Sequence, residues 1–157
     1  MTAQENFIKK YSGPIVRATL GTPLLPSVKM AQLILETGWG KSIVGNNLFG
    51  IKAAGKTTPF WNGGFVQAGT KEVINGKEIS TSSKFRAYAS QEDSIRDHSF
   101  LITNNARYKP VLDATTPESQ AQALQDTGYA TALNYASSLR TLISKYNLKE
   151  LDQKKKS

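Results

Sequence analysis

The 157-residue sequence contains no cysteine and only one histidine, and these two scarcities exclude several kinds of chemistry. Without cysteine there are no disulfides, no thiol nucleophiles and no thiolate metal ligands. With one histidine, a zinc site would need several clustered carboxylates, and the sequence offers no suitable cluster. No stretch approaches the ~18 consecutive apolar residues that a membrane span requires. We therefore expect a soluble protein with no metal, no cofactor and no membrane insertion.

Acidic residues are also scarce, because 12 Asp and Glu stand against 20 Lys and Arg, which gives a formal charge of +8. Such a charge favours anionic partners, namely nucleic acid, a membrane surface or a charged wall polymer. No RNA-recognition motif, zinc-finger spacing or heptad repeat accompanies the basic residues, so nucleic acid is not expected as a partner. The start, MTAQENFIKK, lacks a basic segment followed by an apolar stretch and does not predict a secretory signal.

The length predicts one domain, which we place at residues 1–150, followed by a basic C-terminal tail at 151–157, and we expect its lysine run, 154–156, to be solvated. Helix signals occur at both ends of the chain, around a glycine-rich middle segment. They are a capping box at Thr2 and Glu5, Pro26 followed by a stop at Gly38, a cap at Ser90 for a helix to about 104, Thr116-Pro117 followed by Gly128, and apolar spacing from Tyr135 to Tyr146. This arrangement predicts an α+β fold.

The clearest local signal is KEVINGKEIS (71–80), in which Asn75-Gly76 separates two β-compatible runs. Both residues tolerate positive φ, so this pair is a preferred two-residue hairpin turn. Pairing outward from the turn places Glu72 opposite Ile79.

Glu36 is the leading candidate for a catalytic group. It lies in ILETGWGKS (34–42), in the last turn of the helix that Gly38 ends. There it faces the negative end of the helix dipole and partial desolvation, and both raise the pKa of a carboxyl group. A raised pKa suits a general acid that protonates a glycosidic oxygen. From spacing alone, an ordinary surface glutamate is the alternative and the commoner case.

Glu72, on the first strand of the predicted hairpin, is the candidate second carboxylate. Two carboxylates on separate elements across a cleft are typical of glycoside hydrolysis. A charged residue on an exposed hairpin needs no function, however, and Glu78 is an equally placed competitor by composition.

Aromatic side chains beside glycine-rich segments could stack on sugar rings, although most aromatics belong to cores. They are Trp39, Phe49, Trp61, Phe65 and Tyr129. His98 follows Asp97 on a predicted helix, and neighbours on a helix point in different directions, so a Ser-His-Asp triad is not expected. We interpret His98 as structural.

Six segments resemble, in order, those of glycoside hydrolase family 73, the bacterial peptidoglycan N-acetylglucosaminidases. They are MAQLILETGWGKS, NNLFGIKA, TKEVINGKE, KFRAY, NNARY and ALQDTGYAT, and the likeness extends from about residue 7 to 148. The resemblance implies a lysozyme-like α+β fold, mainly helical, with a small β-hairpin lobe flanking a substrate groove.

The resemblance also implies roles for individual residues. Glu36 in LETGWG matches the general acid, Glu72 matches the hairpin glutamate, and Tyr129 matches a tyrosine near the reacting sugar. The family's next two residues, Asp and Pro, are here Ala132 and Leu133, so no role carries over from that Asp. We expect substrate binding by Trp39, Asn47, Phe49 and Trp61.

The implied reaction is hydrolysis of the β-1,4 bond between N-acetylglucosamine and N-acetylmuramic acid. Glu72 activates water in an inverting route, which needs carboxyl groups roughly 6.5 to 9.5 Å apart. In the alternative route the acetamido oxygen of the substrate attacks, oriented by Tyr129 or Glu72. Other functions to weigh are a non-catalytic peptidoglycan-binding module and a lysozyme-type muramidase.

We expect a monomer whose partners are peptidoglycan glycan strands. Without a signal peptide it would be made in the cytoplasm and reach the wall by holin-type release, phage delivery or dedicated secretion. A phage lysin (endolysin), a tail component, a secreted effector and a bacteriolytic autolysin are all compatible with the sequence.

Overall fold

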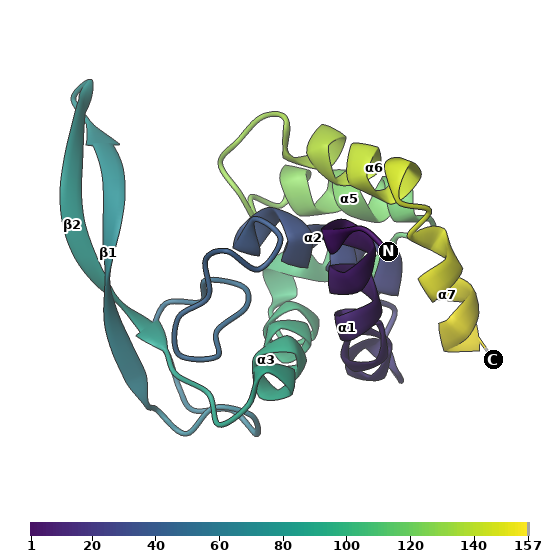
Figure 1. The fold of residues 1–157 in the computed structure, drawn as a ribbon, viewed down its shortest axis with the longest axis horizontal. Helices are drawn as coiled ribbons and strands as arrows, with labels where there is room; N and C mark the ends of the chain where they lie inside the picture. The colour runs from purple at the N-terminus through teal and green to yellow at the C-terminus, as the bar shows by residue number, and fades with distance from the viewer. Residues whose placement is uncertain (157) are drawn as a thin grey trace.

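The computed structural model describes residues 1–156, and the side chains of all of these except Thr70 and Glu72. The helices are α1 (Ala3–Thr19), α2 (Pro26–Thr37), α3 (Gln91–Thr103), the 3₁₀ helix η1 (Ala106–Tyr108), α4 (Lys109–Asp113), α5 (Pro117–Asp126), α6 (Tyr135–Lys145) and α7 (Lys149–Lys156). The strands β1 (Phe65–Ile74) and β2 (Lys77–Arg86) form an antiparallel hairpin. The helices gather into one body and the hairpin stands beside it, joined at its base (Figure 1). The prediction of an α+β fold is confirmed.

The ends of the helices follow the predicted caps. Thr2 and Glu5 form a reciprocal capping box at α1, and the Ser90 hydroxyl accepts from the Asp93 amide at α3. Pro26 begins α2, and Gly38 ends it in the left-handed region at φ 55°. Within the described residues, no helix is both long and apolar enough to cross a bilayer.

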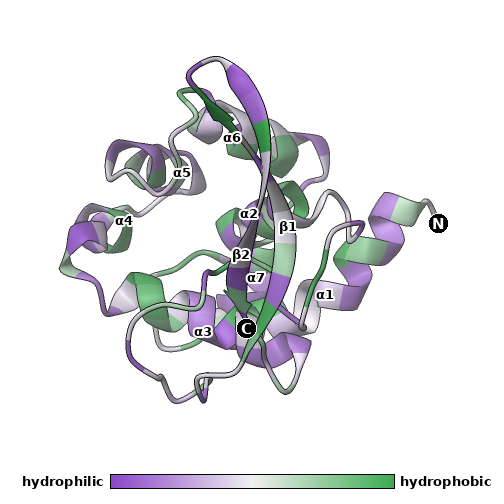
Figure 2. Ribbon diagram, turned by 90° about the vertical axis from the view of Figure 1, so that its left-hand side faces the viewer, coloured by the Kyte–Doolittle hydropathy of each residue, from purple (hydrophilic) through white to green (hydrophobic). Residues whose placement is uncertain are grey.

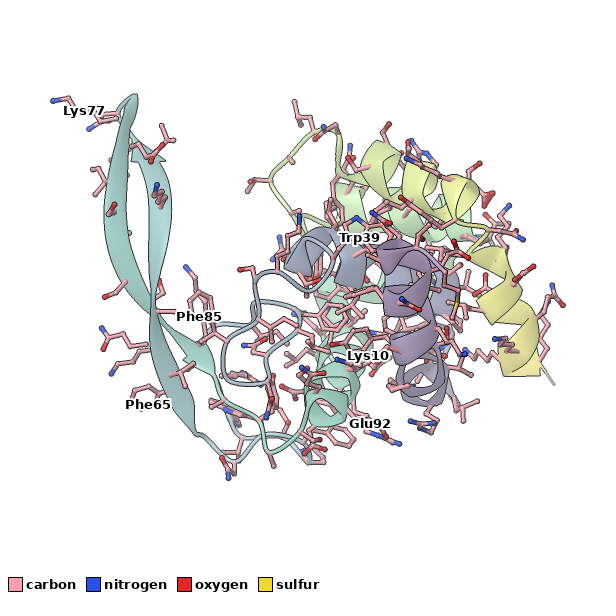
Figure 3. All side chains as sticks on the ribbon, in the orientation of Figure 1. Lys10, Trp39, Phe65, Lys77, Phe85 and Glu92 are labelled. Atoms are coloured by element: carbon pink, nitrogen blue, oxygen red, sulfur yellow. The ribbon has the colours of Figure 1, made fainter. Side chains whose placement is uncertain are left out.

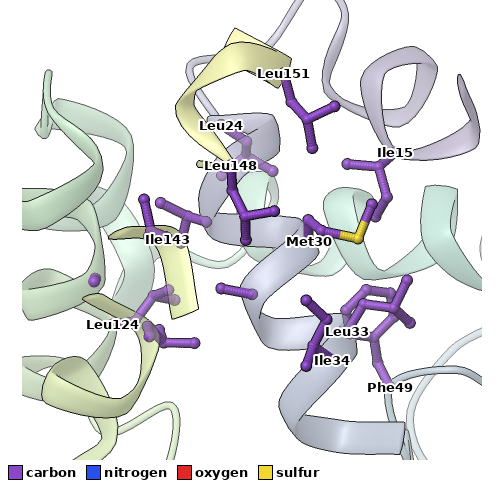
Figure 4. Close-up of a cluster of buried hydrophobic side chains, with 14 of the residues drawn as sticks. Ile15, Leu24, Met30, Leu33, Ile34, Phe49, Leu124, Ile143, Leu148 and Leu151 are labelled. Carbon is purple, nitrogen blue, oxygen red and sulfur yellow. The ribbon is translucent and has the colours of Figure 1, made fainter. Parts of the chain in front are cut away.

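Helix α2 is the centre of the core. Ten of its twelve residues are buried, and α1, α5, α6 and α7 pack against it, with Phe49 beside its C-terminal half (Figure 4). Met30 and Leu33, which are fully enclosed, contribute about 1.5–3 kcal/mol each by burial. The C-terminal turn of α2, which carries Glu36, is therefore held by the best-packed helix of the protein.

The hairpin is built differently. Asn75 and Gly76 make the turn at φ 53° and 76°, and Glu72 pairs with Ile79, so the predicted register is confirmed. Val73 at the tip is exposed. In the view turned by 90°, the two strands run along one face of the helical body, with α1 and α5 on either side (Figure 2).

The described residues of the predicted basic tail, 151–156, belong to helix α7, and Lys154 and Lys156 are exposed as expected. Leu151 and Asp152 are buried, and Asp152 accepts from the amide and the hydroxyl of Ser27 on α2 at 2.8 and 2.7 Å. The Lys155 ammonium donates to the carbonyls of Thr22 and Leu24. The segment is an amphipathic helix, which the run of three lysines at its end made difficult to predict.

Candidate active site

Glu36 lies in a pocket between the helical body and the hairpin. The pocket has a volume of about 220 Å³. Its lining consists of Glu36, Ser42, Val44, Asn47 and Gly50 from the body and Ala68, Gly69 and Phe85 from the hairpin. Figure 3 shows Phe85 projecting from β2 toward the body, whereas Phe65 lies on the outer side of the hairpin. A glutamate at the rigid end of α2 thus faces the second lobe.

The pKa of Glu36 is raised, and burial of its carboxyl group is the cause. The residue as a whole is exposed, so a substrate oxygen can reach it, but protein atoms displace much of the water around the carboxyl group. Gly50 leaves room beside the carboxylate, because a Cβ there would lie 3.8 Å from Oε2. Desolvation therefore favours the protonated acid, and the predicted direction of the pKa shift is confirmed.

Tyr129 lines a second, larger pocket of about 690 Å³ together with His98, Tyr108 and Ile51. Burial raises its pKa far above the usual range, and the charges of Tyr135, Glu36 and Tyr108 add to that shift. Gly50 in the lining of the smaller pocket and Ile51 in the lining of the larger one are consecutive in the chain. The effect of Glu36 on the Tyr129 pKa shows that the two side chains lie within electrostatic reach of each other.

Glu72 lies on β1, three residues beyond Gly69 toward the tip, or about 10 Å along the strand. Its side chain lies outside the described residues. Its competitor Glu78 is exposed and pairs with Lys71 at 3.4 Å. The structure thus places position 72 on the lobe that faces Glu36.

Two of the residues expected to bind substrate, Phe49 and Trp61, are buried and line neither pocket, which contradicts direct sugar contact in this structure. Phe49 is 4% exposed and stacks on His98, with 3.8 Å between ring centroids. Trp61 is 6% exposed, lies under the Arg86 guanidinium at 3.9 Å, and donates from its indole to the Gly64 carbonyl.

Asn47 and Trp39 also have internal partners. The Asn47 amide donates to the carbonyls of Ile51 and Arg86 and accepts from the Ile51 amide, so it braces the loop beside the pocket. Trp39 is partly buried and packs edge-on against Phe7 and Tyr146. Asn47 therefore lines the Glu36 pocket, whereas Trp39 packs within the helical body.

Sequence reasoning missed a buried ion pair at the base of the hairpin. Arg86, at the end of β2, donates to Asp97 on α3 at 2.9 Å. The Asp97 carboxylate also accepts from the hydroxyls of Tyr88 at 2.5 Å and Thr58 at 2.6 Å. The local sequence held no signal for this pair, because Ser94, one helical turn before Asp97, is also polar. The pair fastens the hairpin to α3.

The prediction that Asp97 and His98 do not form a triad is confirmed, because Asp97 faces Arg86 and His98 faces Lys29 and Tyr129. Among the described residues, no three His, Asp or Glu side chains gather where they could hold a metal ion.

Comparisons with known proteins agree with this geometry. Residues 15–148 match the glucosaminidase family model, described as mannosyl-glycoprotein endo-beta-N-acetylglucosaminidase. The chain is 38% identical to exo-glucosaminidase LytG of Bacillus subtilis over 96% of its length and 54% of the relative's. It is 36% identical to peptidoglycan hydrolase FlgJ of Escherichia coli K12 over 87% of its length and 45% of the relative's.

The catalytic domain of the Listeria monocytogenes autolysin Auto superimposes with a TM-score of 0.85, at 34% identity, over 97% of this chain and 89% of that domain. The chain spans about half the length of the two full-length relatives, LytG and FlgJ.

Proposed function

The chain belongs to the glucosaminidase family, glycoside hydrolase family 73, with its lysozyme-like α+β fold, and from that premise we propose that it hydrolyses peptidoglycan. The proposed activity is that of an endo-β-N-acetylglucosaminidase, which cuts the β-1,4 bond between N-acetylglucosamine and N-acetylmuramic acid. The observation that carries this proposal is Glu36, an accessible carboxyl group with a raised pKa at the rigid end of α2, facing the hairpin lobe. We assign the activity to one catalytic domain formed by residues 1–150 together with α7.

Each candidate residue then has a role. Glu36 is the general acid that protonates the leaving oxygen, since its environment keeps the proton on the carboxyl group. Glu72, on the opposite lobe, is the second carboxylate, which activates water or orients the acetamido group. Tyr129 contacts the sugar next to Glu36. The partner is the glycan strand of the wall, and the net charge of +8 favours docking on that anionic polymer.

Clearing of purified peptidoglycan tests the assignment. Glu36→Gln should lower the rate at least ~100-fold, the usual scale of general acid catalysis, with the fold intact by circular dichroism. Glu72→Gln should lose less if the substrate-assisted route operates. Glu78→Gln is the matched control, because it removes an exposed carboxylate from the same hairpin and should keep the parental rate. Parental clearing by Glu36→Gln would overturn the role of Glu36.

Analysis of the products identifies the bond and the route. Reducing N-acetylglucosamine ends support the proposal, whereas reducing muramic acid ends indicate a muramidase, the activity named for a 34% identical Lactococcus lactis relative. Long fragments at early times indicate endo cleavage. Disaccharides alone indicate exo cleavage, the mode given in the name of the relative exo-glucosaminidase LytG. Inverted anomers indicate water activation by Glu72, and retained anomers indicate attack by the acetamido oxygen. Binding without any product would indicate a non-catalytic module.

A further inference from the structure

Lys29 is a buried cation without an anionic partner. It lies on α2, is 2% exposed, and forms none of the ion pairs among the described side chains. Its ammonium nitrogen lies 2.5 Å from Nδ1 of His98 and 5.2 Å from the centre of the Phe49 ring. A buried lysine is costly in stability, so its contact with one histidine calls for an explanation.

His98 continues the contact toward the site. Its Nε2 lies 2.7 Å from the Tyr129 hydroxyl, and its ring is 2% exposed and stacked on Phe49. Burial and the neighbouring Lys29 charge lower the pKa of His98 well below its usual range, so the ring is neutral. A neutral imidazole carries one N–H, and its other nitrogen accepts.

The order of donors and acceptors follows from Lys29. An ammonium has three donors and no acceptor, so Nδ1 of His98 must accept and Nε2 must carry the hydrogen. Nε2–H then donates to the Tyr129 oxygen. The hydrogen of the Tyr129 hydroxyl is left free to point into the pocket of about 690 Å³ that Tyr129 lines, within electrostatic reach of Glu36.

We propose that Lys29 and His98 are positioning residues that orient the Tyr129 hydroxyl as a hydrogen-bond donor to an oxygen of the saccharide bound beside Glu36. The inference rests on the proposed glycosidase function, in which Tyr129 touches the substrate and the other two residues act through it. It also revises the interpretation of His98 as purely structural.

The histidine tautomer tests the first half of the proposal without substrate. Nitrogen NMR of the 15N-histidine-labelled protein is unambiguous, because His98 is the single histidine. At pH 6, below the Lys29 pKa of about 7, the spectrum should show hydrogen on Nε2 and none on Nδ1. Hydrogen on Nδ1 would overturn the proposed orientation, whether or not the protein hydrolyses peptidoglycan.

Kinetics at pH 6 test the second half. Lys29→Met and His98→Leu should each lower kcat about 10- to 100-fold with KM nearly unchanged, as expected for a misplaced catalytic contact. His98→Gln should restore most of the rate, because a carboxamide accepts from Lys29 with its oxygen and donates to Tyr129 with its nitrogen. If His98 were purely structural, His98→Gln would lose as much kcat as His98→Leu.

Two further variants complete the design. In a Tyr129→Phe background, Lys29→Met should cause no additional loss of kcat, since both changes remove the same contact. Ser27→Ala is the matched control: it removes one buried hydrogen bond, from the Ser27 hydroxyl to Asp152, on the same helix, and it should keep the parental kcat. If the parent hydrolyses peptidoglycan and Lys29→Met matches it, the positioning role fails while the glycosidase function stands. If the parent shows no hydrolysis, the function fails and the tautomer alone decides the orientation.

Discussion

Asp97 and His98 are neighbours on α3, and each is the centre of a buried polar cluster. The Asp97 cluster, with Arg86, Tyr88 and Thr58, pairs one negative with one positive charge and supplies hydroxyl donors to the carboxylate. The His98 cluster, with Lys29 and Tyr129, has no described anionic member. Consecutive residues of one helix therefore belong to a charge-balanced cluster, that of Asp97, and to a cluster whose positive charge has no described counter-charge, that of His98. We call them the balanced and the unbalanced cluster.

The two clusters serve different parts of the molecule. The balanced one fastens the end of β2 and the segment around Ala54 to the helical body, where it holds the hairpin. The unbalanced one passes from the core to the pocket beside Glu36. A buried charge with good partners is retained at little cost, whereas one without a counter-charge lowers stability. The difference indicates that the first cluster serves the fold and the second serves the site.

The largest expected effect is on the balanced cluster. Asp97→Asn leaves the Arg86 guanidinium buried without its counter-charge and should lower the free energy of unfolding by about 3–5 kcal/mol. Urea denaturation followed by circular dichroism measures this loss. Asp113→Asn is the control, since its pair with Lys109 is exposed and should change stability by less than about 0.5 kcal/mol. Equal losses of unfolding free energy in Asp97→Asn and Asp113→Asn would show that the buried pair stabilises the fold no more than the exposed pair does.

The unbalanced cluster should reveal itself in the pH dependence of stability. Burial lowers the pKa of Lys29 to about 7, while an unfolded lysine keeps a pKa near 10.4. Between these values the unfolded state binds a proton that the folded state lacks, so the free energy of unfolding rises with pH, by up to about 1.4 kcal/mol per unit.

Lys29→Met should remove this rise, which urea titrations at pH 7, 8 and 9 would measure against the parent. Lys41→Met, at an exposed lysine just after α2, is the control and should keep the parental slope. A parental slope in Lys29→Met would show that Lys29 remains charged in the folded state.

A smaller loss is expected when the balanced cluster keeps its charges and loses one donor. Tyr88→Phe removes the hydroxyl that donates to Asp97 but leaves the Arg86 and Thr58 contacts, so it should cost about 1.5 kcal/mol. Urea denaturation of the single variant and of the double variant with Asp97→Asn checks this value. Because both residues share one cluster, the two losses should not add, and additive losses would show that Tyr88 acts elsewhere.

The sequence predicted local features of the fold but not these two clusters, which form between residues far apart in the chain. Helix caps and the hairpin register depend on residues a few positions apart, so Thr2, Gly38 and Asn75-Gly76 predicted them correctly. The raised pKa of Glu36 was predicted from the partial desolvation expected between apolar neighbours, and burial is its cause.

By contrast, Lys29 and His98 are 69 residues apart, and nothing in their local patterns indicates that they meet. Phe49 and Trp61 failed as predicted sugar platforms for the same reason. The local sequence around an aromatic residue beside glycines is the same whether its ring faces solvent or packs inside the protein. Here Phe49 stacks on a buried imidazole and Trp61 on a buried guanidinium.

Glu36 extends the comparison to catalysis, because desolvation alone shifts its pKa, as it does for Lys29, although in the opposite direction. The acid must be protonated to act, so kcat/KM should fall as pH rises through the Glu36 pKa, with a limb above the ordinary value of about 4.3. A shift caused by burial is screened little by salt, whereas one caused by neighbouring surface charges is screened strongly. The limb should therefore keep its position between low and high ionic strength on a soluble glycan fragment. A limb near 4.3, or one that moves with salt, would place Glu36 among ordinary surface carboxylates, unlike the buried Lys29.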